Sequence, residues 1–61
     1  MIKEYDKIRL KTGIVGRILE ILSDNSFIAE LFLENGDVDT TEIKKVEIAS
    51  VFVETEKPIT A

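Results

Sequence analysis

Residues 6–21 of the chain read DKIRLKTGIVGRILEI, and the architecture of the rest can be built outward from them. Residues 6–11 alternate strictly, with Ile8 and Leu10 on one side and charged side chains on the other. A period of two predicts a half-buried β-strand. Gly13 then ends this strand, because glycine favours a turn.

The second half of this segment, residues 14–22, fits two interpretations. Ile14, Ile18 and Ile21 have helical spacing, so a short amphipathic helix is one alternative. The β-branched residues and the shortness of the segment favour a strand instead. We predict a strand. Because strict alternation would place Ile18 and Ile21 on opposite faces, we also predict a β-bulge near residues 19–20.

Three further strands are predicted after a run of turn-forming residues. In residues 26–33, the side chains predicted to point inward are Phe27, Ala29, Leu31 and Leu33, and those predicted to point outward are Ile28, Glu30 and Phe32. Asn35-Gly36 supplies the positive φ angles of a tight hairpin turn. Residues 37–43 follow as a strand with Val38 as its apolar anchor. Residues 44–47 predict a short 3₁₀ turn, and residues 48–53 a last strand.

The composition indicates an all-β class. Ile, Val and Thr make up 19 of the 61 residues, and these β-branched types favour strands. Five closely spaced short strands match a small, strongly bent barrel. They leave no room for a βαβ crossover or a helical bundle. We predict one barrel domain over residues 1–56 and a flexible tail over residues 57–61.

The residues from Tyr5 to Ile21 resemble the start of a KOW-type SH3-like barrel. That family has a strand of the form D-x-V-x-L followed by G-x-x-G-x-V-x-x-I. Gly13, Gly16, Ile18 and Ile21 stand at the matching positions. The two glycines let the chain turn and pass close to a neighbouring strand, and the aliphatic residues then enter the core.

The remainder is similar to small bacterial SH3-like domains of unknown function. Residues 27–31, Gly36-Asp37 and residues 48–53 correspond to their aromatic strand, turn and final strand. The resemblance spans roughly residues 4–54 and implies a five-stranded SH3-like barrel with a 3₁₀ turn before the last strand. KOW domains commonly bind RNA or ribosomal and transcription proteins, so the resemblance also implies a binding function.

The composition excludes several kinds of chemistry. The chain has no cysteine, histidine or tryptophan, so disulfides, Cys/His zinc sites and Cys or Ser–His catalysis are impossible. It has no phosphate-loop glycine pattern. Nothing in so small a domain suggests a pocket that would perturb a carboxylate or an amine. We expect a protein that is not an enzyme and uses neither a cofactor nor a metal.

No segment has the length of a membrane span or a signal peptide. The longest uninterrupted apolar runs have three residues, whereas a membrane span needs about 20. The N-terminal residues also lack the apolar stretch of a signal peptide. We expect a soluble, cytoplasmic protein without membrane contact.

Charge is unevenly distributed along the chain. The whole carries −4, but residues 1–17 carry +3 and residues 18–61 carry −7. The basic residues that would attract nucleic-acid phosphates are Lys7, Arg9, Lys11 and Arg17. The overall acidity and the lack of interleaved aromatic side chains favour an ordinary solvated strand face instead. A KOW-type nucleic-acid or ribosome-associated module stays open as the alternative.

Four carboxylates gather in the predicted hairpin, at Glu34, Asp37, Asp39 and Glu42. The order of residues in a calcium loop is absent, so we expect no metal there. The acidic surface would suit a basic partner, as in an antitoxin or immunity protein, and this is a further alternative. The plainer interpretation is a solvated hairpin whose charges discourage edge-to-edge pairing.

Apolar residues exceed what a barrel of this size can bury, since they make up 44% of the chain. In the predicted register Val15, Leu19, Ile28 and Phe32 face outward on two adjoining strands. An exposed apolar patch usually marks an interface. We therefore predict a small non-catalytic module that binds protein or self-assembles, with a second copy as its partner, forming a homodimer, rather than nucleic acid.

Overall fold

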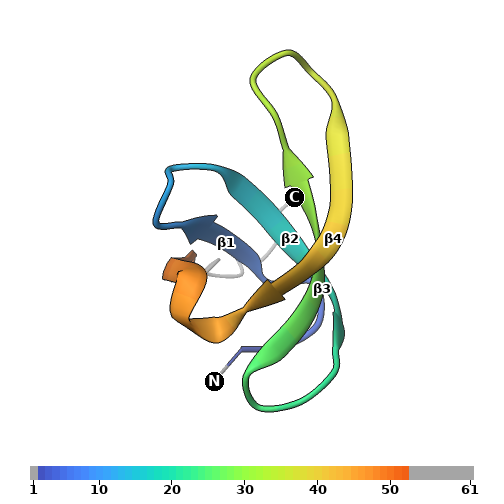
Figure 1. Cartoon of the computed structure of the whole chain (residues 1–61), viewed down its shortest axis with the longest axis vertical. Coiled ribbons are helices and arrows are strands. Elements are labelled where there is room, and N and C mark those ends of the chain that lie inside the picture. The colour runs from blue at the N-terminus through green and yellow to red at the C-terminus, as the bar shows by residue number, and fades with distance from the viewer. Residues whose placement is uncertain (1, 53–61) are drawn as a thin grey trace, which may run out of the picture.

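The computed structural model describes residues 2–52, which form one antiparallel five-stranded sheet and a 3₁₀ turn (Figure 1). The elements are β1 (Lys7–Leu10), β2 (Val15–Ile21), β3 (Ser26–Phe32), β4 (Val38–Lys44), η1 (Lys45–Glu47) and β5 (Ile48–Phe52). This confirms the all-β class, the five strands and the 3₁₀ turn before the last one. The predicted end of the domain at residue 56 and the tail over residues 57–61 lie outside the described residues.

The strands follow the order β4-β3-β2-β1-β5, and each neighbouring pair is antiparallel. The core lies on one face of this sheet and consists of Ile8, Leu10, Ile18, Phe27, Ala29, Leu31 and Ile43. One face can enclose side chains from four strands only if the sheet curls around them, and Figure 1 shows this bend. In the described part of the chain, β4 and β5 are the edges of the sheet, and η1 connects them.

The hairpin from β1 to β2 depends on two glycines, as the sequence predicts. Gly13 has a φ of +97° and donates its N–H to the Leu10 carbonyl at 2.8 Å, which turns the chain. Gly16 lies against β3, where an added Cβ would be 2.5 Å from the Glu30 carbonyl oxygen. The close approach of these two strands therefore requires a residue without a side chain.

The predicted bulge in β2 is confirmed, and the helical alternative is wrong. Ile18 pairs with Ala29, and the next paired residue is Glu20, opposite Ile28, so the ladder skips Leu19. The bulge places Ile21 opposite Phe27 on the core side. Ile21 is nevertheless 40% exposed, so its assignment to the core is wrong. It ends β2 beside an open hollow that it lines with Ile2 and Phe27, where little covers it.

The turn between β3 and β4 differs from the predicted tight turn. Gly36 has a φ of +92°, and it is the one residue of the Asn35-Gly36 pair with a positive φ. The Leu33 N–H donates to the Asp37 carbonyl at 2.9 Å, and the Gly36 N–H donates to the Leu33 carbonyl at 3.0 Å. This is a longer loop that needs one left-handed residue. Asn35 contributes through its side chain, whose Oδ1 accepts from the Asp37 N–H at 3.0 Å.

Strand β4 pairs with all of β3 but has little contact with the core. Ile43 is its one buried residue, at 2% exposure. Val38, predicted as the apolar anchor, is 55% exposed, so that prediction is wrong. The register explains the error, because Val38 lies opposite Phe32 on the outer face of the sheet.

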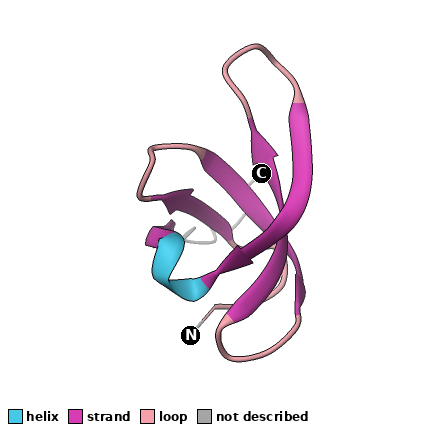
Figure 2. Cartoon of the chain, in the orientation of Figure 1, coloured by secondary structure: helices cyan, strands magenta, loops and turns pink. Residues whose placement is uncertain are grey.

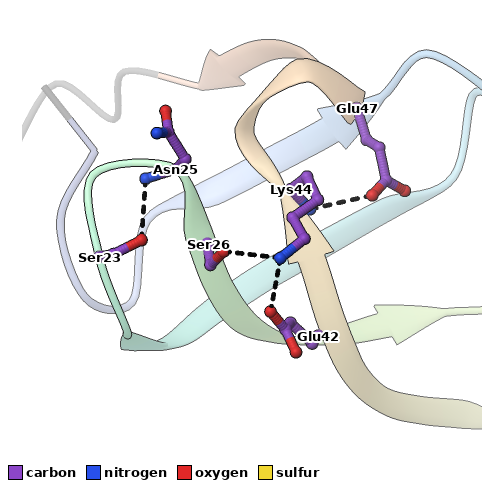
Figure 3. Close-up of polar contacts among 6 residues, drawn as sticks. All are labelled: Ser23, Asn25, Ser26, Glu42, Lys44 and Glu47. Carbon is purple, nitrogen blue, oxygen red and sulfur yellow. Dashed lines mark hydrogen bonds and ion pairs between the residues drawn. The ribbon is translucent and has the colours of Figure 1, made fainter.

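A polar cluster attaches the end of β4 to the start of β3 and to η1 (Figure 3). The Lys44 ammonium donates to Ser26 Oγ and to the Glu42 carboxylate, each at 2.9 Å, while the Lys44 N–H donates to Glu47 at 2.9 Å. Lys44 lowers the pKa of the Glu42 carboxyl below its ordinary value of 4.5, first through this hydrogen bond and then through Coulomb attraction. All of these groups are exposed to solvent, apart from the partly buried Ser26.

Candidate functional site

The outer face of the sheet carries two cross-strand rows of side chains. One row consists of Ser50, Arg9, Val15, Phe32 and Val38, and the next consists of Phe52, Lys7, Arg17, Glu30 and Thr40. Residues that oppose each other on a ladder share a face, so each row is a line of neighbours. Val15 and Phe32 of the predicted interface set therefore share this face with three of the residues predicted for nucleic acid, namely Lys7, Arg9 and Arg17.

Val15, Phe32 and Val38 form an apolar line across β2, β3 and β4. Val15 is half-buried, Phe32 is 38% exposed and Val38 is 55% exposed. Of the predicted interface set, the structure thus brings Val15 and Phe32 directly together. Ile28 lies farther along β3, between Glu20 and Glu42, and is half-buried.

The predicted interface set differs from the apolar line at two residues. It included Leu19, which is not part of the line, and it omitted Val38, which is. Leu19 is the half-buried residue that the β2–β3 ladder skips, so it has no cross-strand partner on β3. Val38 belongs to the apolar line, although the alternation of residues 37–43 predicted it only as the apolar anchor of its strand. Its position opposite Phe32 was the signal that could have identified it, because that register follows from the length of the hairpin loop.

The apolar line ends in a groove between the turn from β1 to β2 and the turn from β3 to β4. Figure 2 shows both turns, drawn pink, in the upper half of the molecule. Apolar side chains in this groove are those of Ile14, Val15, Phe32 and Leu33, and Thr12 and Glu34 are among its polar ones. A hollow that joins an exposed apolar line is a candidate binding surface.

Of the four basic residues predicted to bind nucleic acid, three lie close together on the outer face and one lies apart. Lys7 Nζ and Arg9 Cζ lie 5.4 and 5.3 Å from the centroid of the Phe52 ring, a cation–π arrangement. Arg17 lies next to Lys7 and donates to the Tyr5 carbonyl at 2.9 Å. Lys11 lies apart from this row, exposed in the turn after β1.

Phe52 is the residue of this basic region that sequence reasoning missed. It is far from Lys7 and Arg9 in the chain, and only the antiparallel pairing of β5 with β1 brings it to them. It supplies the aromatic ring whose absence weighed against nucleic acid. The remaining exposed large apolar side chains of the described residues lie outside both rows and are Tyr5, Ile21, Leu22 and Val46.

The charges around the groove are not paired with one another. Within residues 2–52 the one salt bridge joins Lys44 to Glu42. No group of three or more carboxylates in this range is arranged to hold a metal ion.

The single helical element of residues 2–52 is the short η1 turn, so this range contains no helix able to cross a membrane.

No protein-family model matches the sequence, and comparisons with curated proteins and with solved structures find no match either. What the surface does is therefore inferred from its geometry and chemistry. Two features define it: the apolar line with its groove, and the basic row beside the Phe52 ring.

Proposed function

We propose that the protein is a small non-catalytic module that binds a second copy of itself through the outer face of β2, β3 and β4. The observation that carries this proposal is the unbroken line of Val15, Phe32 and Val38 on that face. Removal of such a surface from water is the main driving force of association. The groove beside it adds concave apolar surface, which Ile14 and Leu33 line.

The absence of a catalytic role is part of the same proposal. Active sites gather ionisable groups whose pKa values are shifted by burial or by charged neighbours. In the described residues no charged or polar side chain is buried. The carboxyl of Glu42, whose pKa is lowered, is held by the exposed Lys44 in the structural cluster at the end of β4.

We also propose that the fold is an SH3-like barrel of the KOW type. Three features support this: the strand order β4-β3-β2-β1-β5, the curl of the sheet around one core, and the 3₁₀ turn between β4 and β5. The turn at Gly13 and the close contact at Gly16 agree with the glycine spacing of that family.

Sedimentation velocity across a wide range of protein concentration tests self-association. We expect the mass of the wild type to rise towards that of a dimer at high micromolar concentration. Phe32→Asp places a charge in the middle of the apolar line, so this variant should stay monomeric while keeping its melting temperature. Val46→Asp is the matched control, because Val46 is 72% exposed and lies outside the line. A wild type that is monomeric throughout contradicts the proposal.

One observation favours nucleic-acid binding as a second candidate function. Lys7 and Arg9 both lie over the Phe52 ring, and basic side chains interleaved with an aromatic ring suit a single strand. Fluorescence anisotropy with single-stranded RNA and DNA at low salt tests it. Binding that is lost in Lys7→Glu/Arg9→Glu and retained in Phe32→Asp would favour this function. No binding at low salt ends it.

A further inference from the structure

Strand β4 directs one row of its backbone groups away from the sheet. It is an edge strand, and Figure 1 shows it (yellow) on the outer side of the molecule. Just beyond its two ends, the Asp37 carbonyl accepts from the Leu33 N–H at 2.9 Å and the Lys45 N–H donates to the Asn25 carbonyl at 2.8 Å. Odd-numbered residues therefore bond to β3. Because an antiparallel ladder alternates, the even-numbered residues point their N–H and carbonyl groups away from β3. These residues are Val38, Thr40, Glu42 and Lys44.

Three of these four positions are open in the described part of the chain. The Lys44 N–H donates to the Glu47 carboxylate at 2.9 Å, which closes the position next to η1. No hydrogen bond within residues 2–52 reaches the outward N–H or carbonyl of Val38, Thr40 or Glu42, and this whole stretch is exposed. Unpaired edge groups are a template for another strand. An extended segment can therefore add to the sheet here.

The side chains beside this open edge differ between its two faces. On the core side, Asp39 lies opposite Leu31, and Asp37 precedes it on the same face. Both carboxylates are exposed, and neither forms a salt bridge within residues 2–52. On the outer side, Val38 and Thr40 are exposed as well. A strand added beyond β4 would place its side chains alternately beside the two carboxylates and beside this uncharged pair.

We propose that the open edge of β4 binds an extended basic segment of another protein, in which lysine or arginine alternates with apolar residues. The proposal goes beyond the self-association proposed above and does not depend on it. Backbone hydrogen bonds along residues 38–42 would hold the segment, and its side chains would select it. Its basic residues would lie on the core side beside Asp37 and Asp39. Its apolar residues would lie on the outer side, where one would extend the apolar line beyond Val38.

A second copy of β4 fits this edge less well than a basic segment. Antiparallel pairing on a two-fold axis centred at Asp39 or Glu42 would set a carboxylate opposite its own copy, which is destabilising. Centred at Thr40, the pairing makes the two Asp39 side chains diagonal neighbours. Centred at Thr41, its outermost pairs would need the Lys44 N–H, which is already bonded. The charge of the edge thus opposes its own copy and favours a basic strand.

Amide hydrogen exchange measured by NMR tests the pairing directly. The probe is a short peptide of alternating lysine and valine with both ends blocked. In the free protein, the odd-numbered amides of β4 should exchange slowly because they bond to β3, and its open amides, those of Val38, Thr40 and Glu42, should exchange fast. Saturating peptide should slow the exchange of these three open amides by at least about tenfold.

Three control peptides separate strand pairing from attraction between charges. A peptide of alternating glutamate and valine should not protect the open amides, since its carboxylates would meet those of the edge. Methylation of every valine amide removes the donors from one edge of the lysine peptide, and methylation of every lysine amide removes them from the other. One methylated peptide should lose binding and the other keep it, because only one edge of a strand pairs with β4. Equal binding of both overturns the proposal.

Two variants of Thr40 test the backbone of the edge. Thr40→Pro removes an N–H that β3 does not use, so the protein should still fold but should no longer bind the peptide. Thr40→Ala is the matched control, because it changes the side chain and keeps the N–H. Its affinity for the peptide should stay close to that of the wild type. Peptide binding that Thr40→Pro leaves unchanged overturns the proposal.

The charges of the edge are tested by a pair of neutral substitutions. Asp37→Asn/Asp39→Asn should bind the lysine peptide about threefold to tenfold more weakly than the wild type, because two cross-strand charge pairs are lost. Glu4→Gln/Glu20→Gln carries the same change of net charge on exposed residues outside β4 and should bind more tightly than the edge variant. Equal affinities of these two variants would overturn the assignment of a basic partner.

The exchange rates of the free protein decide whether the edge is open to a partner. Open amides that are already protected without peptide would overturn the proposal, because the edge would then be occupied. Protection that grows with protein concentration would identify the occupant as a second copy. Failure of peptide binding leaves the proposed self-association standing, since sedimentation of the wild type and Phe32→Asp tests that contact on a different surface.

Discussion

Strands β3 and β4 are each seven residues long and pair along their whole length, but they contribute very differently to the core. β3 has a strand on both sides and buries Phe27, Ala29 and Leu31. β4 is an edge of the sheet and buries Ile43 alone. The two strands therefore pair along the same length, but β3 is held to the core by more buried side chains than β4.

The weak anchoring of β4 distinguishes two ends of the β3–β4 hairpin: one end is held to the core, and the other is available for binding. An exposed hydrogen bond contributes only about 1 kcal/mol to stability, so β4 depends on its one buried side chain and on the Lys44 cluster near its end. Both anchors lie at the end next to η1. At the opposite end, β3 ends with Phe32 and β4 begins with Val38. The turn between these two strands projects beyond the rest of the molecule (Figure 1). The surface proposed for self-association lies on this less constrained end.

The largest effect is expected from Ile43→Ala, which removes the one buried side chain of β4. Truncation of a fully buried Ile lowers the free energy of unfolding by about 2–5 kcal/mol. A domain of this size has a total stability of only roughly 3–9 kcal/mol at about 0.05–0.15 kcal/mol per residue. Urea denaturation should show a severely destabilised or unfolded protein.

Val38→Ala is the matched control on the same strand, because it also shortens an aliphatic β-branched side chain. Val38 is 55% exposed, so we expect a loss below about 1 kcal/mol. Equal losses for Val38 and Ile43 would show that β4 is anchored along its whole length. That result would mean that the two ends of the hairpin do not differ in how firmly they are held.

A smaller loss is expected from Gly16→Ala, which tests how firmly β3 is held in the middle of the sheet. The added Cβ would lie 2.5 Å from the Glu30 carbonyl oxygen and 2.8 Å from the Leu31 side chain. β3 is paired on both sides and cannot easily move away, so we expect a loss of about 1–3 kcal/mol in thermal or urea unfolding.

Gly36→Asn provides the comparison in the projecting turn. Nothing lies within 4 Å of a Cβ added at Gly36, and its positive φ is of the kind that asparagine tolerates best among residues with a side chain. This variant should stay close to the wild type in stability. A Gly16→Ala protein as stable as Gly36→Asn would mean that β2 and β3 separate without loss, contrary to the packing described.

The sequence predicts those features of the fold that depend on local spacing. Alternation alone places Ile8 and Leu10 inward, and it gives the inward and outward faces of β3. The bulge was predictable because Ile18 and Ile21 can share a face of the strand only if one residue is skipped between them. The bulge determines which face Ile21 is on, but it does not determine whether other residues bury Ile21. Gly16 is explained by spacing too, because the next strand had to pass close to it.

The candidate site depends on long-range pairing, and the sequence predicts less of it. Alternation cannot tell whether another element covers a strand end, and this is why Val38 was predicted as an apolar anchor although it is exposed on an edge strand. Phe52 reaches Lys7 and Arg9 only through the β1–β5 ladder. The groove exists because two turns distant in the chain lie at the same end of the sheet, which requires the complete strand order.

The smallest effect concerns the pH dependence of the anchor at the end of β4. Lys44 lowers the pKa of Glu42 in the folded protein below the ordinary value of 4.5. A lowered pKa in the folded state means that ionised Glu42 stabilises the fold at pH values above 4.5. This contribution is lost as the pH falls through the lowered pKa, because the protonated carboxyl no longer attracts Lys44. Wild type should therefore be more stable than Glu42→Gln at neutral pH, and the difference should vanish in acid.

A double-mutant cycle assigns this difference to the pair of side chains. Free energies of unfolding are measured for wild type, Glu42→Gln, Lys44→Met and the double variant at neutral and acidic pH. The coupling energy should be favourable at neutral pH and absent in acid, and it should decrease with added salt, since both side chains are exposed. A coupling that is absent at neutral pH would mean that Lys44 stabilises the hairpin through Ser26 and through its own N–H to the Glu47 carboxylate rather than through the Glu42 carboxylate. The end of β4 would then be held without Glu42, and its contrast with the projecting end would not depend on the protonation of that carboxyl.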